Sequence, residues 1–283
     1  MNKEDTENLI SAIDNLIDKS GELINKHGFD SKPDSISSQE LESFQRPLSL
    51  KTAYSQGHTF VEVAGDQLMA FSRTLKEPIQ TIAPFTCSRS VLESCALAIW
   101  LLNNEITVTE RVKRSLSFRF EGMIQQKKLA NSSRTKNGLE VIEIQTNKII
   151  KIAQDMSFPI FRDKKDKITG VATRMPSITN LAKNILNKEH EYRLLSAVTH
   201  AHSFALIQTS FAKYGDSEDV EIVLYEKSLD PRFILYLCKL TNEVFCNAVT
   251  TLTKLHGTYH IDYDYLFEET NEKVKAYYQL LYS

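Results

Sequence analysis

Residues 86–104, TCSRSVLESCALAIWLLNN, are apolar on nearly every side of a helical wheel and carry only two charges, Arg89 and Glu93. A helix with this pattern has no face for water, so it needs neighbouring elements on most sides. The two charges lie four residues apart on one face of the helix, where they can form an ion pair. We therefore expect a helical fold around 86–104, with a buried Arg89–Glu93 pair.

The composition of the whole chain also favours helices. The 283 residues include nine Gly and seven Pro, which is well below the usual shares of roughly 7% and 5%, so turn residues and strand breakers are scarce. We predict an all-α multi-helix bundle with a peripheral N-terminal helix and one or two short strand or hairpin excursions. The helices expected in the main domain are 50–76, 86–104, 107–131, 139–156, 177–188, 190–213, 230–256 and 264–281.

The N-terminal part of the chain differs from the remainder. Residues 6–27 place Ile and Leu side chains on one helical face, which predicts an amphipathic helix that packs on the body or on a partner. Residues 28–49 contain Ser, Pro and Asp and indicate a linker with one short helical turn around 39–44. We divide the chain into 1–48, an N-terminal helix and linker, and 49–283, a helical bundle domain.

Two segments interrupt the helical pattern of the main domain. Residues 157–176 contain a charge run and predict an irregular or hairpin-like excursion. The sequence VEIVLY, at 220–225, predicts one short strand.

The net charge and the N-terminal sequence bear on whether the chain binds nucleic acid or enters a membrane. With 34 basic and 36 acidic residues and a net charge of −2, the chain has no bulk attraction for nucleic acid, so any RNA contact must be local. The start, MNKEDTENL, is too polar for a signal peptide, and no apolar run reaches the roughly 18 to 20 residues of a membrane span. We expect a cytoplasmic protein that does not enter a membrane.

No motif predicts a metal or a cofactor. The four cysteines form two C-x7-C spacings, which are not metal-ligand spacings, so we interpret them as reduced core thiols. The chain has no glycine-rich phosphate loop, nucleophile elbow, H-E-x-x-H motif or zinc framework. These absences exclude the common kinase, hydrolase and zinc-protease signatures.

Residues 192–212, YRLLSAVTHAHSFALIQTSFA, have one charged side chain in 21 positions. On a helix their polar groups gather into one stripe, which suits a buried hydrogen-bonded seam. His200 is the titratable centre of the stripe, and Arg193 lies two turns before it, about 20° away around the axis. His200 is therefore either a proton-transfer group beside a cation or a core histidine with satisfied hydrogen bonds. The stripe contains Tyr192, Ser196, Thr199, His200 and Ser203, with Arg193 at one edge, whereas His202 lies on the apolar side and is interpreted as a packing residue.

Further arginines follow residue 104. Arg111 and Arg114 share a helical face, and if that face points inward their guanidiniums add to Arg89 in a cluster that binds phosphate or carboxylate. If it points outward, Glu110 and Arg114 form a surface ion pair. The Arg89–Glu93 pair also has two interpretations. In the first, Arg89 binds an anion while Glu93 orients Arg89 or acts as a base. In the second, the pair fixes the helix register.

Three blocks carry a resemblance to known proteins: RSVLESCALAIWLL, ERVKR and YRLLSAVTHAH. Together they resemble a group of uncharacterised bacterial all-helical proteins over roughly residues 85–210. The last block also resembles the Arg-x4-6-His signature of the HEPN superfamily, whose members include metal-independent ribonucleases of toxin and defence systems. The match concerns Arg193 and His200. The residue after the arginine is usually polar in that family and is Leu194 here, and the family implies a homodimer with facing Arg–His pairs.

Two functions are compatible with these observations. The first is an HEPN-like ribonuclease in which His200 is the acid or base, Arg193 holds the scissile phosphate, and Tyr192 and Ser196 orient them. The second is a non-catalytic helical binding module with a buried polar network or a pocket for a small anionic ligand. Its residues are Arg89, Glu93, Arg111, Arg114 and His200. The expected partner is thus RNA or a small anion, with no cofactor.

Overall fold

The computed structural model describes residues 3–27, 31–132, 136–216, 223–260 and 262–280. Over these residues the fold is all-α, as expected, with eleven helices and two small two-stranded sheets. The elements are α1 (Lys3–His27), α2 (Ile36–Ser43), α3 (Pro47–Thr74), α4 (Ala83–Leu102), α5 (Val108–Ser132), α6 (Lys136–Asp155), β1 (Ile160–Arg162), β2 (Ile168–Val171), α7 (Ile178–Asn184), α8 (Glu189–Thr199), α9 (Ser203–Thr209), β3 (Phe211–Asp216), β4 (Val223–Lys227), α10 (Pro231–His256) and α11 (Asp262–Leu280).

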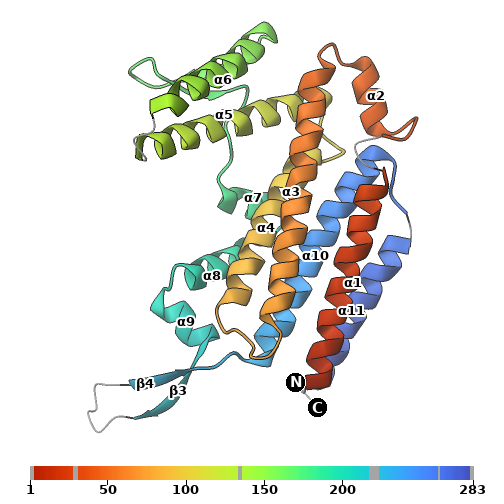
Figure 1. Cartoon of the computed structure of the whole chain (residues 1–283), viewed down its shortest axis with the longest axis vertical. Helices are drawn as coiled ribbons and strands as arrows, with labels where there is room; N and C mark the ends of the chain where they lie inside the picture. Colours follow the sequence, from red (N-terminus) through yellow and green to blue (C-terminus); the bar gives the residue numbers. More distant parts are fainter. Residues whose placement is uncertain (1–2, 28–30, 133–135, 217–222, 261, 281–283) are drawn as a thin grey trace.

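Helix α4 lies in the middle of the bundle, between α3, α10 and α8 (Figure 1). By length and composition alone it could cross a membrane, but 56% of its apolar window is buried inside the protein. Helix α3 approaches it closely because Gly57 has no side chain: a Cβ there would lie 2.4 Å from Leu102 Cγ. Helix α4 is thus the central core helix that its sequence predicts.

The N-terminal segment packs onto the same core. Helix α1 lies along α11 at the outer edge of the bundle (Figure 1), and Leu9, Ile13 and Leu16 are fully buried in one hydrophobic cluster with α4. The expected linker contains α2, which begins where the Ser35 hydroxyl accepts the Ser38 N–H at 3.2 Å. That side-chain cap is a common start signal for a helix.

Two hairpins project from the helices. In the excursion at 157–176, β1 and β2 pair antiparallel with Ile160 opposite Val171, which confirms the predicted hairpin. After α9, β3 pairs antiparallel with β4, and this second hairpin extends away from the bundle (Figure 1). The predicted strand at 220–225 agrees with β4 from Val223 onward. Residues 220–222 of the prediction lie outside the described residues.

The predicted continuous helix at 190–213 is wrong. Helix α8 ends at Thr199, α9 begins at Ser203, and Ala201 between them has a left-handed φ of 56°. The amide of His202 donates to the Ala197 carbonyl at 2.9 Å, and the amide of Ala201 donates to Val198 at 3.0 Å. These two bonds form a Schellman helix end, in which the left-handed residue is usually glycine. With alanine there, the sequence carries no stop signal.

Candidate functional site

Four predicted site residues meet where α4 packs on α8, and we name them the Arg89 cluster: Arg89, Glu93, Tyr192 and His200. Arg89 Nε donates to Glu93 Oε1 at 2.8 Å, and the Tyr192 hydroxyl donates to the same oxygen at 3.1 Å. Arg89 Nη1 lies 3.2 Å from His200 Nε2. Its guanidinium carbon lies 5.7 Å from the centre of the Tyr192 ring. The structure therefore joins residues from two stretches about 100 positions apart.

The Arg89–Glu93 pair is present as predicted, but it is half-buried. The Arg89 and Glu93 side chains are 21% and 30% exposed. Burial lowers the pKa of Arg89, the Glu93 carboxylate raises it, and the net change is upward. Burial, followed by the nearby Glu93 charge, raises the pKa of Tyr192. The guanidinium thus keeps its charge and the phenol keeps the proton that it donates to Glu93.

His200 directly follows the last residue of α8. The residue caps α8 with its backbone amide, which donates to the Ser196 carbonyl at 3.0 Å, and its side chain is exposed. A guanidinium only donates, so in this contact His200 Nε2 is the acceptor and its lone pair points at Arg89. Nε2 can accept a proton from a ligand only when it no longer bonds Arg89.

Beyond Ala201 the chain turns outward. His202 is exposed, and therefore it does not pack into the core as its place on the predicted wheel suggested. Its ring centre lies 6.5 Å from that of His200 and 6.1 Å from that of Phe204. The left-handed backbone at Ala201 thus brings the His202 ring close to His200, which contacts Arg89, and the Phe204 ring close to His202.

Arg193 does not contact His200 in the structure. Its guanidinium is 64% exposed and is bonded to Glu189 on the same helix, with Nη2 and Oε1 2.8 Å apart. Arg193 and His200 are seven residues apart, which is about 10.5 Å along a helix. Arg193 turns back to Glu189, and it is Arg89 of α4 that contacts His200.

Arg111 and Arg114 lie at the other end of α4 and form no common cluster with Arg89. Arg111 is fully buried, donates to Glu40 at 3.0 and 3.1 Å, and donates to the Leu101 carbonyl at 2.9 Å. Arg114 pairs with Glu110 at 2.9 Å. Leu101 is twelve residues beyond Arg89, about 18 Å along a helix. The expectation of one arginine cluster is therefore not met.

Sequence reasoning missed the partners of Arg111. Glu40 lies in α2, where the sequence predicted one short helical turn within a linker, and its carboxylate also accepts the Tyr54 hydroxyl at 2.5 Å. Next to Tyr54, His256 Nδ1 lies 3.1 Å from the hydroxyls of both Ser31 and Ser37. Burial lowers the pKa of His256 to about 4, and the charge of Arg111 also contributes. These contacts attach the N-terminal segment to α3, α5 and α10.

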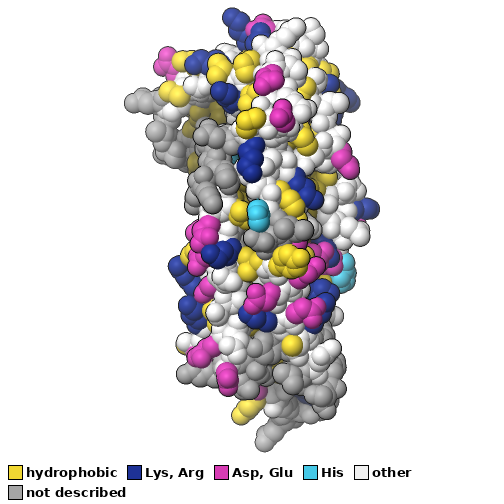
Figure 2. All heavy atoms as spheres, turned by 90° about the vertical axis from the view of Figure 1, so that its right-hand side faces the viewer, with side chains coloured by type: hydrophobic (Ala, Val, Ile, Leu, Met, Phe, Trp, Pro, Cys, Tyr) yellow, Lys and Arg dark blue, Asp and Glu magenta, His cyan; other side chains and the backbone are white. Residues whose placement is uncertain are grey.

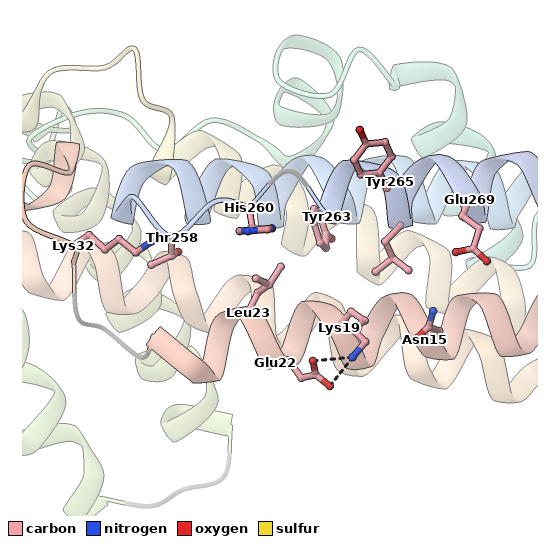
Figure 3. Close-up of a pocket in the computed structure, with 11 residues that line it drawn as sticks. Asn15, Lys19, Glu22, Leu23, Lys32, Thr258, His260, Tyr263, Tyr265 and Glu269 are labelled. Carbon is pink, nitrogen blue, oxygen red and sulfur yellow. Dashed lines mark hydrogen bonds and ion pairs between the residues drawn. The ribbon is translucent and has the colours of Figure 1, made fainter.

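A groove of about 560 Å³ runs between α1 and α11 (Figure 3). Lys32, Thr258 and His260 lie at one end of it, and Glu269 lies near the other. Lys19 and Glu22 on its rim pair with each other, and Glu269 pairs with Lys273. On the side of the molecule that carries these helices, positive and negative side chains alternate without a patch of one sign (Figure 2). None of the residues predicted for the site lines this groove.

The described residues contain no group of three or more His, Cys, Asp or Glu side chains that could hold a metal ion. All four cysteines are free thiols, and three of them are buried. Burial raises the pKa of Cys246 to about 12. Such thiols stay protonated and fill space in the core.

Comparison with known proteins adds no assignment. No protein-family model, curated protein or solved structure matches this chain. The geometry of the Arg89 cluster therefore carries the assignment of a function.

Proposed function

We propose that the chain is a cytoplasmic, HEPN-like ribonuclease that needs no metal and acts at the Arg89 cluster. The observation that carries the proposal is the 3.2 Å contact between the Arg89 guanidinium and the exposed imidazole of His200. A guanidinium binds phosphate oxygens with directed hydrogen bonds. When a bound phosphate takes up the Arg89 N–H groups, His200 Nε2 is released from Arg89, and an imidazole with a free ring nitrogen can remove a proton near neutral pH.

The proposed reaction uses the 2′-hydroxyl of the RNA as the nucleophile. His200 accepts the proton of the 2′-hydroxyl. The 2′-oxygen then attacks phosphorus, and the bond from phosphorus to the 5′-oxygen breaks. The leaving 5′-oxygen takes up a proton from solvent or from His202. The products are a 2′,3′-cyclic phosphate and a 5′-hydroxyl. Arg89 neutralises the charge that develops on the phosphate, and Glu93 and Tyr192 hold Arg89 in place.

The backbone near His200 shapes the candidate surface. A left-handed conformation costs a non-glycine residue about 1 to 2 kcal/mol, and Ala201 adopts it with a φ of 56°, as Ala172 does elsewhere with a φ of 61°. Here the strain brings His200 and His202 to one surface, at the edge of the Arg89 cluster.

The test is incubation of purified protein with single-stranded and structured RNA in the presence of EDTA. We expect cleavage that leaves a cyclic phosphate, detected by mass spectrometry. His200→Ala and Arg89→Ala should each lower the rate by about 100-fold or more. His190→Ala, which removes an exposed histidine at the start of α8, is the matched control and should leave the rate unchanged. A folded His200→Ala protein that cuts as fast as wild type would refute the mechanism.

The test also separates the two arginines. If the Arg193–His200 pair of the family signature is the catalytic pair, Arg193→Ala should be as damaging as Arg89→Ala. Because Arg193 is bonded to Glu189 and exposed, we expect Arg193→Ala to retain most of the activity. The homodimer that the resemblance implies is tested by sedimentation of the same preparation.

A second candidate function is a non-catalytic binding module. The observation that favours it is the Glu93 carboxylate, which bonds both Arg89 and Tyr192 and so satisfies the cluster internally. In this case the cluster fixes the packing of α8 on α4 and presents its surface to a partner. Absence of RNA cleavage by folded wild type, with Glu93→Ala lowering stability, would favour this function over the first.

A further inference from the structure

The exposed rings beyond Ala201 form a feature separate from the Arg89 cluster, and we name His202 and Phe204 the ring pair. The two rings are stacked, with an angle of 28° between their planes and 6.1 Å between their centres. The Phe204 side chain is 60% exposed, and Ile207, one turn further along α9, is 42% exposed. The core-facing side of α9 is instead formed by Ala205 and Thr209, which are buried.

Packing does not explain Phe204. A phenyl ring contributes to folding in proportion to the apolar area that it removes from water, and most of this ring stays in water. The position of Phe204 relates it to the candidate site. Its ring centre lies 6.1 Å from that of His202, and the ring centre of His202 lies 6.5 Å from that of His200. The ring pair therefore continues the surface on which Arg89 and His200 lie.

We propose that the ring pair is a stacking platform for an unpaired base, so that the substrate is single-stranded RNA. This inference rests on the proposed function: Arg89 holds a phosphate, and a base further along the same strand lies on Phe204. Aromatic side chains bind single strands in this way, because every unpaired base offers a flat face. A base inside a duplex is stacked on its neighbours and cannot use the platform.

The charge of the chain agrees with binding through stacking. The net charge of −2 gives no bulk attraction for a polyanion, and the guanidiniums of Arg89 and Arg193 are already bonded to Glu93 and Glu189. Binding that depends on phosphate contacts weakens steeply with salt, by a slope of about −0.7 per neutralised phosphate for a single strand. We expect a slope of about −1 for this protein, much shallower than that of a basic nucleic-acid-binding domain.

The experiment uses fluorescence anisotropy with two uncleavable, 2′-O-methyl single-stranded probes. One probe carries all its bases, and the second is abasic at its central nucleotides but has the same phosphates. Phe204→Leu keeps an apolar side chain and removes the aromatic face, whereas Phe204→Tyr keeps the ring. The matched control is Tyr265→Leu, because Tyr265 is also largely exposed, at 65%, and lies on α11.

We expect Phe204→Leu to weaken binding of the complete probe by about 5- to 100-fold, as for the loss of one stacked base, and to leave binding of the abasic probe unchanged. Phe204→Tyr and Tyr265→Leu should bind both probes like wild type. Equal binding by wild type and Phe204→Leu would overturn the platform, as would an equal loss with both probes, which indicates a phosphate or structural role.

The two proposals fail in different ways. If Phe204 is needed for the complete probe but the unmodified RNA is not cut, the platform stands and the ribonuclease mechanism falls. If RNA is cut and Phe204→Leu binds normally, the mechanism stands and the platform falls. If wild type binds neither probe, both are overturned, and the exposed rings remain as a surface for a protein partner.

Discussion

The carboxylate of Glu93 limits how strongly Arg89 can attract an anion. The pair is half-buried, so its ionic interaction is screened less than that of a fully exposed pair. Glu93→Gln keeps an oxygen that accepts hydrogen bonds from Arg89 and Tyr192 but removes the negative charge. We expect this variant to bind an uncleavable single strand several-fold more tightly at low salt, with a steeper salt dependence. Anisotropy titrations at two salt concentrations measure this, and unchanged affinity at low salt would contradict it.

His256 makes the stability of the fold depend on pH. Burial lowers its pKa from 6.5 to about 4 in the folded protein, whereas the unfolded chain protonates it near 6.5. The unfolded state therefore binds more protons between these two values, and stability falls as the pH drops from 6.5 toward 4. At pH 5 we expect a loss of about 2 kcal/mol from this group. Urea unfolding at pH 7 and pH 5 measures it, and His256→Gln should show a smaller pH dependence than wild type.

At the scale of the elements, the junction between α8 and α9 depends on the left-handed backbone of Ala201. Glycine adopts that backbone without steric cost, although it also makes the unfolded chain more flexible. We expect Ala201→Gly to stabilise the protein by up to about 1 kcal/mol. Ala201→Val should destabilise it, because a β-branched residue is more strained there. Thermal unfolding measures both variants, and a change of the same sign in both would show that the backbone of the junction is not what they affect.

The sequence predicts most helices because each has an apolar face with the helical repeat, as α1 and α10 show, or is apolar on nearly every side, as α4 is. It misses the end of α8 because alanine takes the place of the usual glycine, and the error places His202 on the core side of a helix, whereas it is exposed. It does predict Arg89, Glu93, Tyr192 and His200 as site residues, because charged and polar side chains in apolar helices must find partners. It cannot show that Arg89, from a distant helix, reaches His200.

For the whole molecule, the pairing of Arg111 with Glu40 connects the N-terminal segment to the helices of the body. Both side chains are removed from water, at 0% and 13% exposure. Glu40→Ala leaves the buried guanidinium without its carboxylate, which typically costs about 3 to 5 kcal/mol. We expect a large fall in the urea midpoint. Glu22→Ala, which breaks an exposed pair with Lys19 on α1, should change it little, and equal effects of the two variants would disprove the structural role of Glu40.

The packing of α1 on α11 has a consequence for how the protein is made. The Ser20 hydroxyl lies 3.0 Å from the Tyr263 hydroxyl, and these residues are separated by 243 positions. At a synthesis rate of about 5 to 20 residues per second, α1 leaves the ribosome roughly 12 to 50 s before this partner exists. During that interval Leu9, Ile13 and Leu16 of α1, which become fully buried, have no α11 to cover them. A nascent chain stopped before α11 should therefore be a substrate for chaperones and prone to aggregate.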